Sequence, residues 1–376
     1  MDRTDYTRRD FLKAVGLVAV SAISVSRVFL RAAQVGGKAA GVTVLKRNKC
    51  DKGYRLYSSR QTEVAHLIDI DGREVQRWSY PQGQTWHYAE MLPDGHLVAI
   101  IKDIMILELD WDSQLVWKAE VTAHHDFDRL ANGNTLVVCR EYVVNEALRP
   151  GELKSDYIVE LTPGGKVVWE WHADRHVQEI AALVPLEFPL ANQDWGHMNT
   201  VESLPDGPAA RRDARFRAGN ILFSCRNIDT IGVIDRTSGK VIWAWGPGTL
   251  DKQHMPTMLP NGNILVYDNG NTLERTRILE LDPLTGKILW QYQAEPPTDF
   301  YSPTRGSSQR LPNGNTLIAE SDSGRLFEVT PEGEIVWEFL NPDLQQDGRR
   351  MPLYRAVRYP RDLVESILKK HGSTED

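Results

Sequence analysis

The sequence predicts an all-β fold, a six-bladed β-propeller that occupies residues 50–362 of a 376-residue chain. Three observations lead to this prediction. One strand-turn-strand pattern recurs six times, a second hairpin pattern precedes five of the copies, and no sustained helical period follows the first 33 residues. Units of four antiparallel strands that recur at intervals of about 40 to 50 residues are typical of propeller blades.

In the first pattern, an apolar strand leads through a short turn into a strand that carries a tryptophan. Six tryptophans stand at the equivalent position, namely Trp78, Trp117, Trp169, Trp243, Trp290 and Trp337. Large aromatic side chains contribute much of the buried area in packed interfaces. We therefore expect these six to pack between blades and not to hold a cofactor.

The second pattern is Leu-Pro-Asn-Gly or a close variant, followed by a β-rich run. It begins at Leu92, Leu130, Leu204, Leu259 and Leu311. Asn-Gly and Asp-Gly between apolar alternations are strong signals for a β-hairpin. Each blade is therefore expected to run from an inner strand A, through this turn, to strands B, C and D, the last of which carries the tryptophan.

The copy that ends at Trp78 comes first in the chain and lacks a strand A. Residues 53–58 and 64–70 can supply its strands B and C, and residues 353–360 can supply the innermost strand. The sequence thus predicts a propeller closed by N- and C-terminal strands, an arrangement that removes open sheet edges. Residues 363–376 are expected to form a C-terminal tail.

The first residues read as an export signal. Arg8 and Arg9 precede Asp10-Phe11-Leu12-Lys13, an apolar run covers 14–26, and small residues follow. This order resembles a twin-arginine signal. We therefore predict a twin-arginine signal peptide over 1–33, a periplasmic or secreted location, and the twin-arginine translocation machinery as a partner.

Charge and cysteine content limit the partners and the covalent links. The formal net charge of −7 argues against a nucleic-acid partner, because phosphate binding needs a basic surface. The chain has three cysteines, Cys50, Cys139 and Cys225, which would allow one disulfide in an oxidising compartment. Cys139 and Cys225 hold matching positions in neighbouring blades, where strands B should be too far apart to bond, so buried thiols are expected. The oligomeric state is left open.

Aligning the strands A on the leucine of the second pattern brings polar residues into register. Five residues before that leucine stand His87, His125, Asn199, His254 and Gly306, and His197 stands two residues before Asn199. Six residues into strand B stand Lys102, Arg140, Arg226, Asn269 and Ser321. Equivalent positions in a propeller converge on one mouth of the central channel. We therefore predict a ring of histidines beside a ring of cationic and amide groups, a combination that suits an anion.

Several short segments carry a resemblance to a known family. They are His124-His125-Asp126-Phe127, Asp194-Trp195-Gly196-His197-Met198-Asn199, Ser224-Cys225-Arg226, Gln253-His254 and Asp268-Asn269. Together they resemble the bacterial arylsulfate sulfotransferase family, a family of β-propellers, from about Asp51 to Pro360. The resemblance implies transfer of a sulfuryl group from an aryl sulfate to a phenol, both small molecules, without the nucleotide donor PAPS and without a cofactor.

The resemblance also implies roles for single residues. His254 matches the nucleophile that takes the sulfuryl group as a sulfohistidine, and His197, Asn199 and Arg226 match the groups that bind the sulfuryl oxygens. His125 is the candidate proton donor to the leaving phenolate. The chemistry agrees, because a neutral imidazole offers a lone pair near neutral pH. By their places in the two rings, His87, Lys102 and Asn269 are further substrate-binding candidates.

Two alternatives remain open. The first is a metal-dependent propeller hydrolase or oxygenase in which His87, His125 and His254 ligate zinc or iron, with the carboxylates of Asp126 and Asp268 available nearby. Arg226 weighs against it, since a guanidinium beside a metal cation is unfavourable.

The second alternative is a non-catalytic binding scaffold. Residues 235–243 and 282–290 resemble the repeats of propellers that bind the quinone cofactor PQQ, some of which only bind protein partners. Those repeats would explain the outer strands, but they leave the histidine ring without a role.

Overall fold

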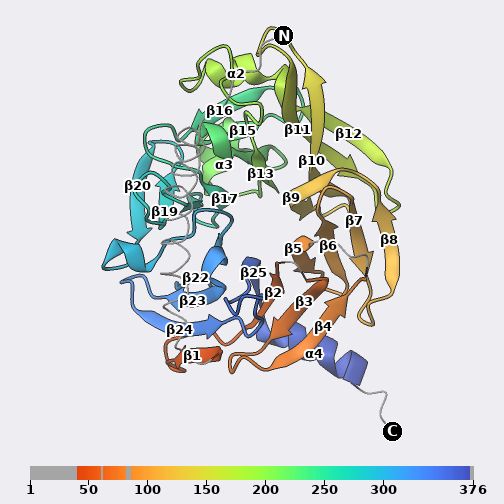
Figure 1. Ribbon diagram of the computed structural model, residues 1–376, viewed down its shortest axis with the longest axis vertical. Helices are drawn as coiled ribbons and strands as arrows, with labels where there is room; N and C mark the ends of the chain where they lie inside the picture. The colour runs from red at the N-terminus through yellow and green to blue at the C-terminus, as the bar shows by residue number, and fades with distance from the viewer. Residues whose placement is uncertain (1–39, 61, 82–85, 373–376) are drawn as a thin grey trace, which may run out of the picture.

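The computed structural model describes residues 40–60, 62–81 and 86–372. Within these residues the strands form six sheets arranged around a common centre (Figure 1). The protein is therefore an all-β six-bladed propeller, as the sequence predicts. The signal peptide predicted over residues 1–33 lies outside the described residues.

Five blades each use four consecutive antiparallel strands. The first blade comprises β5 (Trp86–Met91), β6 (Leu97–Ile101), β7 (Met105–Leu109) and β8 (Leu115–Ala119), and the second β9 (Ala123–Arg129), β10 (Thr135–Val144), β11 (Glu152–Leu161) and β12 (Val167–His172). The third comprises β13 (Met198–Ser203), β14 (Ile221–Cys225), β15 (Thr230–Ile234) and β16 (Val241–Trp245), and the fourth β17 (His254–Met258), β18 (Ile264–Asp268), β19 (Arg277–Asp282) and β20 (Lys287–Tyr292). The fifth comprises β21 (Ser307–Arg310), β22 (Thr316–Glu320), β23 (Arg325–Val329) and β24 (Ile335–Leu340).

The sixth blade combines strands from distant parts of the sequence. Its order is β25 (Leu353–Tyr359), β2 (Tyr54–Ser59), β3 (Val64–Ile68) and β4 (Glu74–Ser79). A further strand, β1 (Gly41–Leu45), pairs with β24 and makes the fifth blade five-stranded. We did not expect β1, because it precedes the first recognisable repeat.

The Leu-Pro-Asn-Gly turns have the local chemistry that a tight hairpin requires. In the fourth blade the Gly262 amide donates to the carbonyl oxygen of Leu259 at 2.8 Å, and Gly262 has a left-handed φ of 88°. The third blade differs. There α3 (Pro208–Arg212) is inserted after Gly207, and Gly219 takes over the bond to the Leu204 carbonyl at 2.9 Å.

The repeated tryptophans pack between blades. Trp78 and Trp337 are completely buried. The indole nitrogen of Trp337 donates to the carbonyl oxygen of Ile70 at 2.8 Å, and that of Trp290 donates to Pro331 at 2.8 Å, so each reaches the next blade. The structure therefore gives these residues the packing role that we expected.

Few helices accompany the sheets. Helix α2 (Val177–Ala181) lies between the second and third blades in the chain, and α4 (Arg361–Gly372) follows β25. The segment 363–376, which we assigned to a tail, thus contains most of α4, and Val364 and Ile367 of this helix are buried in the cluster that includes Leu97. In the described part of the chain no helix is long and apolar enough to span a membrane. All three cysteines are buried and unpaired.

Trp337→Ala tests the contribution of these indoles. The side chain is fully buried, and the Arg55 guanidinium lies 4.6 Å from its ring centroid. We expect the free energy of unfolding to fall by about 3–5 kcal/mol, because the substitution removes buried area and leaves a cavity. Urea unfolding measures it. Leu289→Ala is the control, since Leu289 is 57% exposed and its loss should change stability by less than about 0.5 kcal/mol. Equal effects of the two substitutions would contradict this packing role.

Candidate active site

Irregular pairing of the inner strands places the predicted histidines at the centre. In the first four blades the register between strands A and B shifts beside the residues singled out from the sequence. Such β-bulges leave residues unpaired and re-aim their side chains. His125, within one of these irregular stretches, has a left-handed φ of 60°, and His197, directly before β13, has a left-handed φ of 52°. The bulges thus turn polar side chains out of the strand alternation and toward one another.

The structure brings the predicted histidines together. The ring centroid of His125 lies 5.2 Å from that of His87 and 4.9 Å from that of His197. His254 lies near them, since a proton on His254 would lower the pKa of His125. His87 and His125 are each 7% exposed, and His254 is 2% exposed. These four residues form what we call the histidine ring.

Burial keeps three members of the histidine ring neutral. It is the largest cause that lowers the pKa of His87, His125 and His254 well below the ordinary value of 6.5. Positive neighbours lower these pKa values further, Lys102 for His87 and Arg226 for His254. At neutral pH each of the three imidazoles therefore keeps a lone pair on one nitrogen.

Hydrogen bonds decide which nitrogen of His254 carries the hydrogen. Its Nδ1 lies 2.7 Å from Asn269 Oδ1 and 3.2 Å from the carbonyl oxygen of Lys252. The Asn269 amide nitrogen donates to the carbonyl oxygens of Ser302 and Arg305 at 2.7 and 2.8 Å, so Oδ1 must be the atom that faces His254. Nδ1 therefore donates, and Nε2 keeps the free lone pair. Asn269, which we predicted to bind substrate, is fully buried and instead positions His254.

Asn199 and Gln253 hold the chain next to His254. Asn199 is fully buried. Its amide nitrogen donates to the Gln253 carbonyl oxygen at 2.8 Å, and its oxygen accepts from the Thr200 hydroxyl at 3.1 Å. The Gln253 side chain donates to Ser224 Oγ at 3.0 Å and to two backbone carbonyl oxygens. One N–H of Asn199 is left for a ligand, since a primary amide has two.

Arg226 supplies a positive charge beside His254. It follows β14, and its guanidinium donates to Asn227 Oδ1 at 3.0 Å and to the Pro303 carbonyl oxygen at 3.4 Å. Among the described residues it has no ion-pair partner within 4.0 Å. Burial lowers the pKa of Arg226, but a guanidinium stays protonated in proteins. Lys102, whose pKa burial also lowers, adds positive potential at His87.

A carboxylate orients His197. Nδ1 of His197 lies 2.7 Å from Asp194 Oδ2, which also accepts from Lys154 Nζ at 2.6 Å. Burial alone would raise the pKa of Asp194, but the hydrogen bonds from His197 and Lys154 hold it below its ordinary value. Asp194 is therefore an ionised acceptor for the Nδ1 hydrogen, and Nε2 is the nitrogen of His197 left for a ligand.

The C-terminal strand contributes Tyr354, one of the aromatic residues that the sequence places near this face, and Arg355, which sequence reasoning missed. In β25, Tyr354 stacks on His87 with 4.6 Å between ring centroids, and its hydroxyl donates to the His125 carbonyl oxygen at 3.1 Å. Arg355 is 4% exposed and pairs with Asp126. Both fall where β25 and β2 also lose register. An alignment of β25 with the other inner strands could have found Arg355, but β25 lacks the Leu-Pro-Asn-Gly turn used to align those strands.

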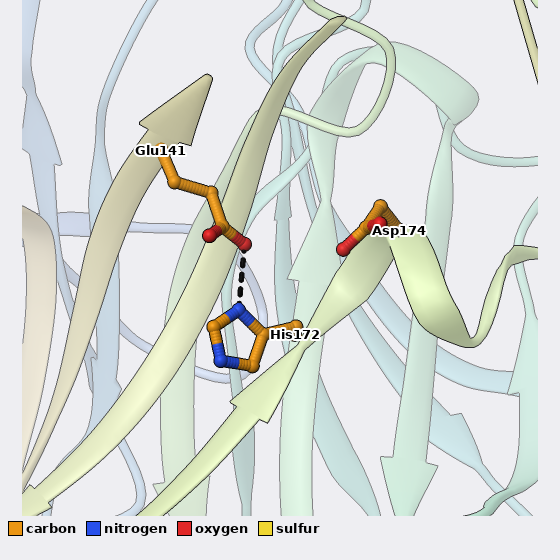
Figure 2. A group of neighbouring side chains, drawn as sticks. All are labelled: Glu141, His172 and Asp174. Carbon is orange, nitrogen blue, oxygen red and sulfur yellow. Dashed lines mark hydrogen bonds and ion pairs between the residues drawn. The ribbon is translucent and has the colours of Figure 1, made fainter. Parts of the chain in front are cut away.

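The carboxylates considered for a metal site are engaged elsewhere. Asp126 pairs with Arg355, and Asp268 pairs with Arg277. In the described residues, three ligand atoms of His, Cys, Asp or Glu come within 4.8 Å of one another in one group, Glu141, His172 and Asp174 (Figure 2). This group lies in the second blade and includes no member of the histidine ring, and His172 Nδ1 is already 2.8 Å from Glu141 Oε1. The histidine ring is not pre-assembled as a three-ligand metal site.

The fold and the site together define a propeller whose centre combines a neutral imidazole with a guanidinium that has no ion-pair partner among the described residues. Residues 88–342 match the model of the family described as Arylsulfotransferase (ASST). The match covers more than half of the chain, so the protein belongs to this family, and at family level it is a sulfotransferase. No curated protein matches the chain.

Solved structures resemble the chain in fold. A protein of unknown function from Bacteroides caccae is 14% identical with a TM-score of 0.53, and the alignment covers 83% of this chain and 100% of that one. A streptogramin B lyase is 12% identical with a TM-score of 0.49, over 85% of this chain and 93% of that one. At this identity the first likeness shows the propeller fold alone.

The lowered pKa of His87 makes stability depend on pH. As pH falls through 6.5, the unfolded chain binds a proton at this residue and the folded protein does not, so stability present above pH 6.5 is lost below it. In His87→Asn, Oδ1 can replace Nδ1 as acceptor of the His125 amide hydrogen without titrating. We expect wild type to lose up to about 1.4 kcal/mol more than the variant between pH 7.5 and pH 5.5.

Wild type and His87→Asn must be compared, because buried carboxyl groups change the free energy of unfolding with pH in the opposite direction. Burial raises the pKa of Glu90 to about 7, of Glu202 to about 8 and of Asp126 to about 6, so these groups favour the folded state as pH falls. Urea unfolding at each pH gives the two curves. Parallel curves would mean that His87 titrates normally in the folded protein.

Proposed function

We propose that the protein transfers a sulfuryl group from an aryl sulfate to a phenol through a covalent intermediate on His254. The observation that carries this proposal is the fixed state of that imidazole. His254 is buried and neutral, its Nδ1 hydrogen is directed to Asn269, and its Nε2 lone pair is free beside the unpaired charge of Arg226. A neutral nucleophile next to a cation suits attack on an anionic ester.

In this mechanism the sulfuryl oxygens are held by donors around His254. Negative charge shifts onto the leaving oxygen as the S–O bond breaks, and fixed donors stabilise the transition state without reorganising. Arg226 supplies N–H groups and charge, and Asn199 supplies its remaining amide hydrogen. His197, oriented by Asp194, offers Nε2 at the same centre. Membership of the arylsulfotransferase family supports the same reaction class.

His125 is the proton donor in the proposed cycle. Its backbone amide donates to His87 Nδ1 at 3.1 Å and its carbonyl accepts from Tyr354, so its ring has a defined place among the other histidines. His125 protonates the leaving phenolate when His254 takes the sulfuryl group. In the second half-reaction it removes the proton from the acceptor phenol, as one group can in a ping-pong cycle.

The proposal extends to the setting of the reaction. The twin-arginine leader expected over residues 1–33 would export the folded enzyme, so we propose that it meets its phenols in the periplasm or outside the cell. Fractionation of cells with and without a functional twin-arginine pathway tests this part. Retention of the protein in the cytoplasm of both strains would contradict it.

Release of 4-nitrophenol from 4-nitrophenyl sulfate, with and without added phenol, tests the reaction. We expect phenol to accelerate release by metal-free wild-type protein and phenyl sulfate to form. His254→Ala should lower the rate at least about 1,000-fold. Arg226→Ala should lower it about 100- to 1,000-fold, because it removes a transition-state donor.

The alternatives give different outcomes in this assay. Wild type that is inert until zinc or iron is added would contradict the proposal and support metal-dependent chemistry. Wild type that is inert with several donors under both conditions, and that binds a quinone, would support the binding scaffold. Leu289→Ala serves as the activity control, since its side chain is exposed and lies in outer strand β20.

A further inference from the structure

Two buried side chains, His124 and Asp156, follow His125 in a line of short polar contacts. His124 Nδ1 lies 2.5 Å from His125 Nδ1, and His124 Nε2 lies 3.0 Å from Asp156 Oδ1. His124 is 1% exposed and Asp156 is 3% exposed. The contact between His124 Nε2 and Asp156 does not have the angle of an aligned hydrogen bond, and among the described residues this nitrogen has no other hydrogen-bond partner. The line therefore runs from the carboxylate through His124 to the histidine ring.

Each member of this line is held in place by other bonds. Asp156 Oδ2 accepts from the Met198 amide at 2.6 Å, which leaves Oδ1 for His124. The backbone of His125 is fixed at both its amide and its carbonyl group, through His87 and Tyr354. Because Nδ1 of His125 faces His124, Nε2 is the nitrogen of His125 that is left for a ligand.

Only one hydrogen fits between the two Nδ1 atoms, so one imidazole donates and the other accepts. With a hydrogen on His124 Nε2 beside the Asp156 carboxylate, two arrangements are possible. In the first, His124 Nδ1–H donates to His125 Nδ1, and His125 carries its hydrogen on Nε2. In the second, His125 Nδ1–H donates to His124, and His125 Nε2 is bare. The two differ by one proton.

We propose that Asp156 and His124 form a proton relay that supplies a hydrogen to His125 Nδ1 when His125 gives up its Nε2 hydrogen. This rests on the function proposed above. When the S–O bond breaks and the His254 Nε2–S bond forms, the hydrogen on His125 Nε2 passes to the phenolate oxygen, and the hydrogen on His124 Nδ1 moves to His125 Nδ1. When the acceptor phenol gives its hydrogen to His125 Nε2, the Nδ1 hydrogen returns to His124. Asp156 and His124 are thus positioning residues that act through His125.

Asp156→Asn is a selective test of the relay. The oxygen of the substituted amide can keep the bond from the Met198 amide, while its nitrogen now faces His124 Nε2 and requires it to accept. Asp128→Asn is the matched control. Its carboxylate is half-buried and also accepts a backbone hydrogen, from Ser203 at 2.7 Å, but it contacts no histidine among the described residues. Thermal unfolding followed by circular dichroism verifies that both variants are folded.

The readout is the dependence of rate on the leaving group. Phenyl sulfate leaves as a basic phenolate that needs a proton, whereas 4-nitrophenolate needs little help. We expect Asp156→Asn and His124→Gln to lower kcat for phenyl sulfate about 100-fold and for 4-nitrophenyl sulfate less than about 5-fold. Asp128→Asn should change both rates alike. Equal losses with the two donors, or no loss with either, would overturn the relay.

A second measurement tests the hydrogen shared by His124 and His125 independently of sulfuryl transfer. In resting protein with ¹⁵N-labelled histidine, the hydrogen between the two Nδ1 atoms should give a far-downfield proton resonance coupled to nitrogen. It should disappear in His124→Gln and remain in Asp128→Asn. If wild type transfers no sulfuryl group but shows this resonance, the proposed function fails and the shared hydrogen stands. If wild type is active but lacks the resonance, and the leaving-group effect is absent, the relay alone fails.

Discussion

The Arg355 guanidinium connects three of the inner strands on which the site is built. It pairs with Asp126 of β9 and donates to the Asn199 carbonyl oxygen of β13 at 2.8 Å, while Asp126 accepts from the Val201 amide at 3.0 Å. Both charged groups are buried, so each needs the other to offset the cost of leaving water. Because Arg355 lies on β25, this connection between inner strands forms only when the C-terminal strand joins the sheet of β2, β3 and β4.

Burial also sets the chemistry of the centre. It keeps the imidazoles of His87, His125 and His254 neutral, and it cannot neutralise the guanidinium of Arg226. The site therefore combines nucleophilic and proton-carrying imidazoles with a permanent positive charge, which would be screened in water. The supporting amides complete this arrangement. Asn269 directs the His254 hydrogen away from Nε2, and Gln253 anchors the adjoining chain.

Much of the fold could be predicted because its turns and its aromatic packing leave local marks in the sequence. Leucines that precede Asn-Gly turns set the register, and this register was enough to bring His87, His125 and His254 together. It could not reveal Arg355, since β25 has no such turn. The roles of Asn269 and Asp156 depend on partners from distant segments, the carbonyl of Ser302 and the imidazole of His124, and no local pattern encodes those contacts.

The most direct test of the central claim is the mass of the protein after brief exposure to an aryl sulfate without acceptor. We expect wild type to gain one sulfuryl group, fragmentation under neutral or basic conditions to locate it on His254, and added phenol to remove it with formation of the new ester. Asn269→Ala should load more slowly, and His254→Asn should not load. Turnover by wild type with no adduct, or an adduct on any other residue, would contradict a covalent mechanism through His254.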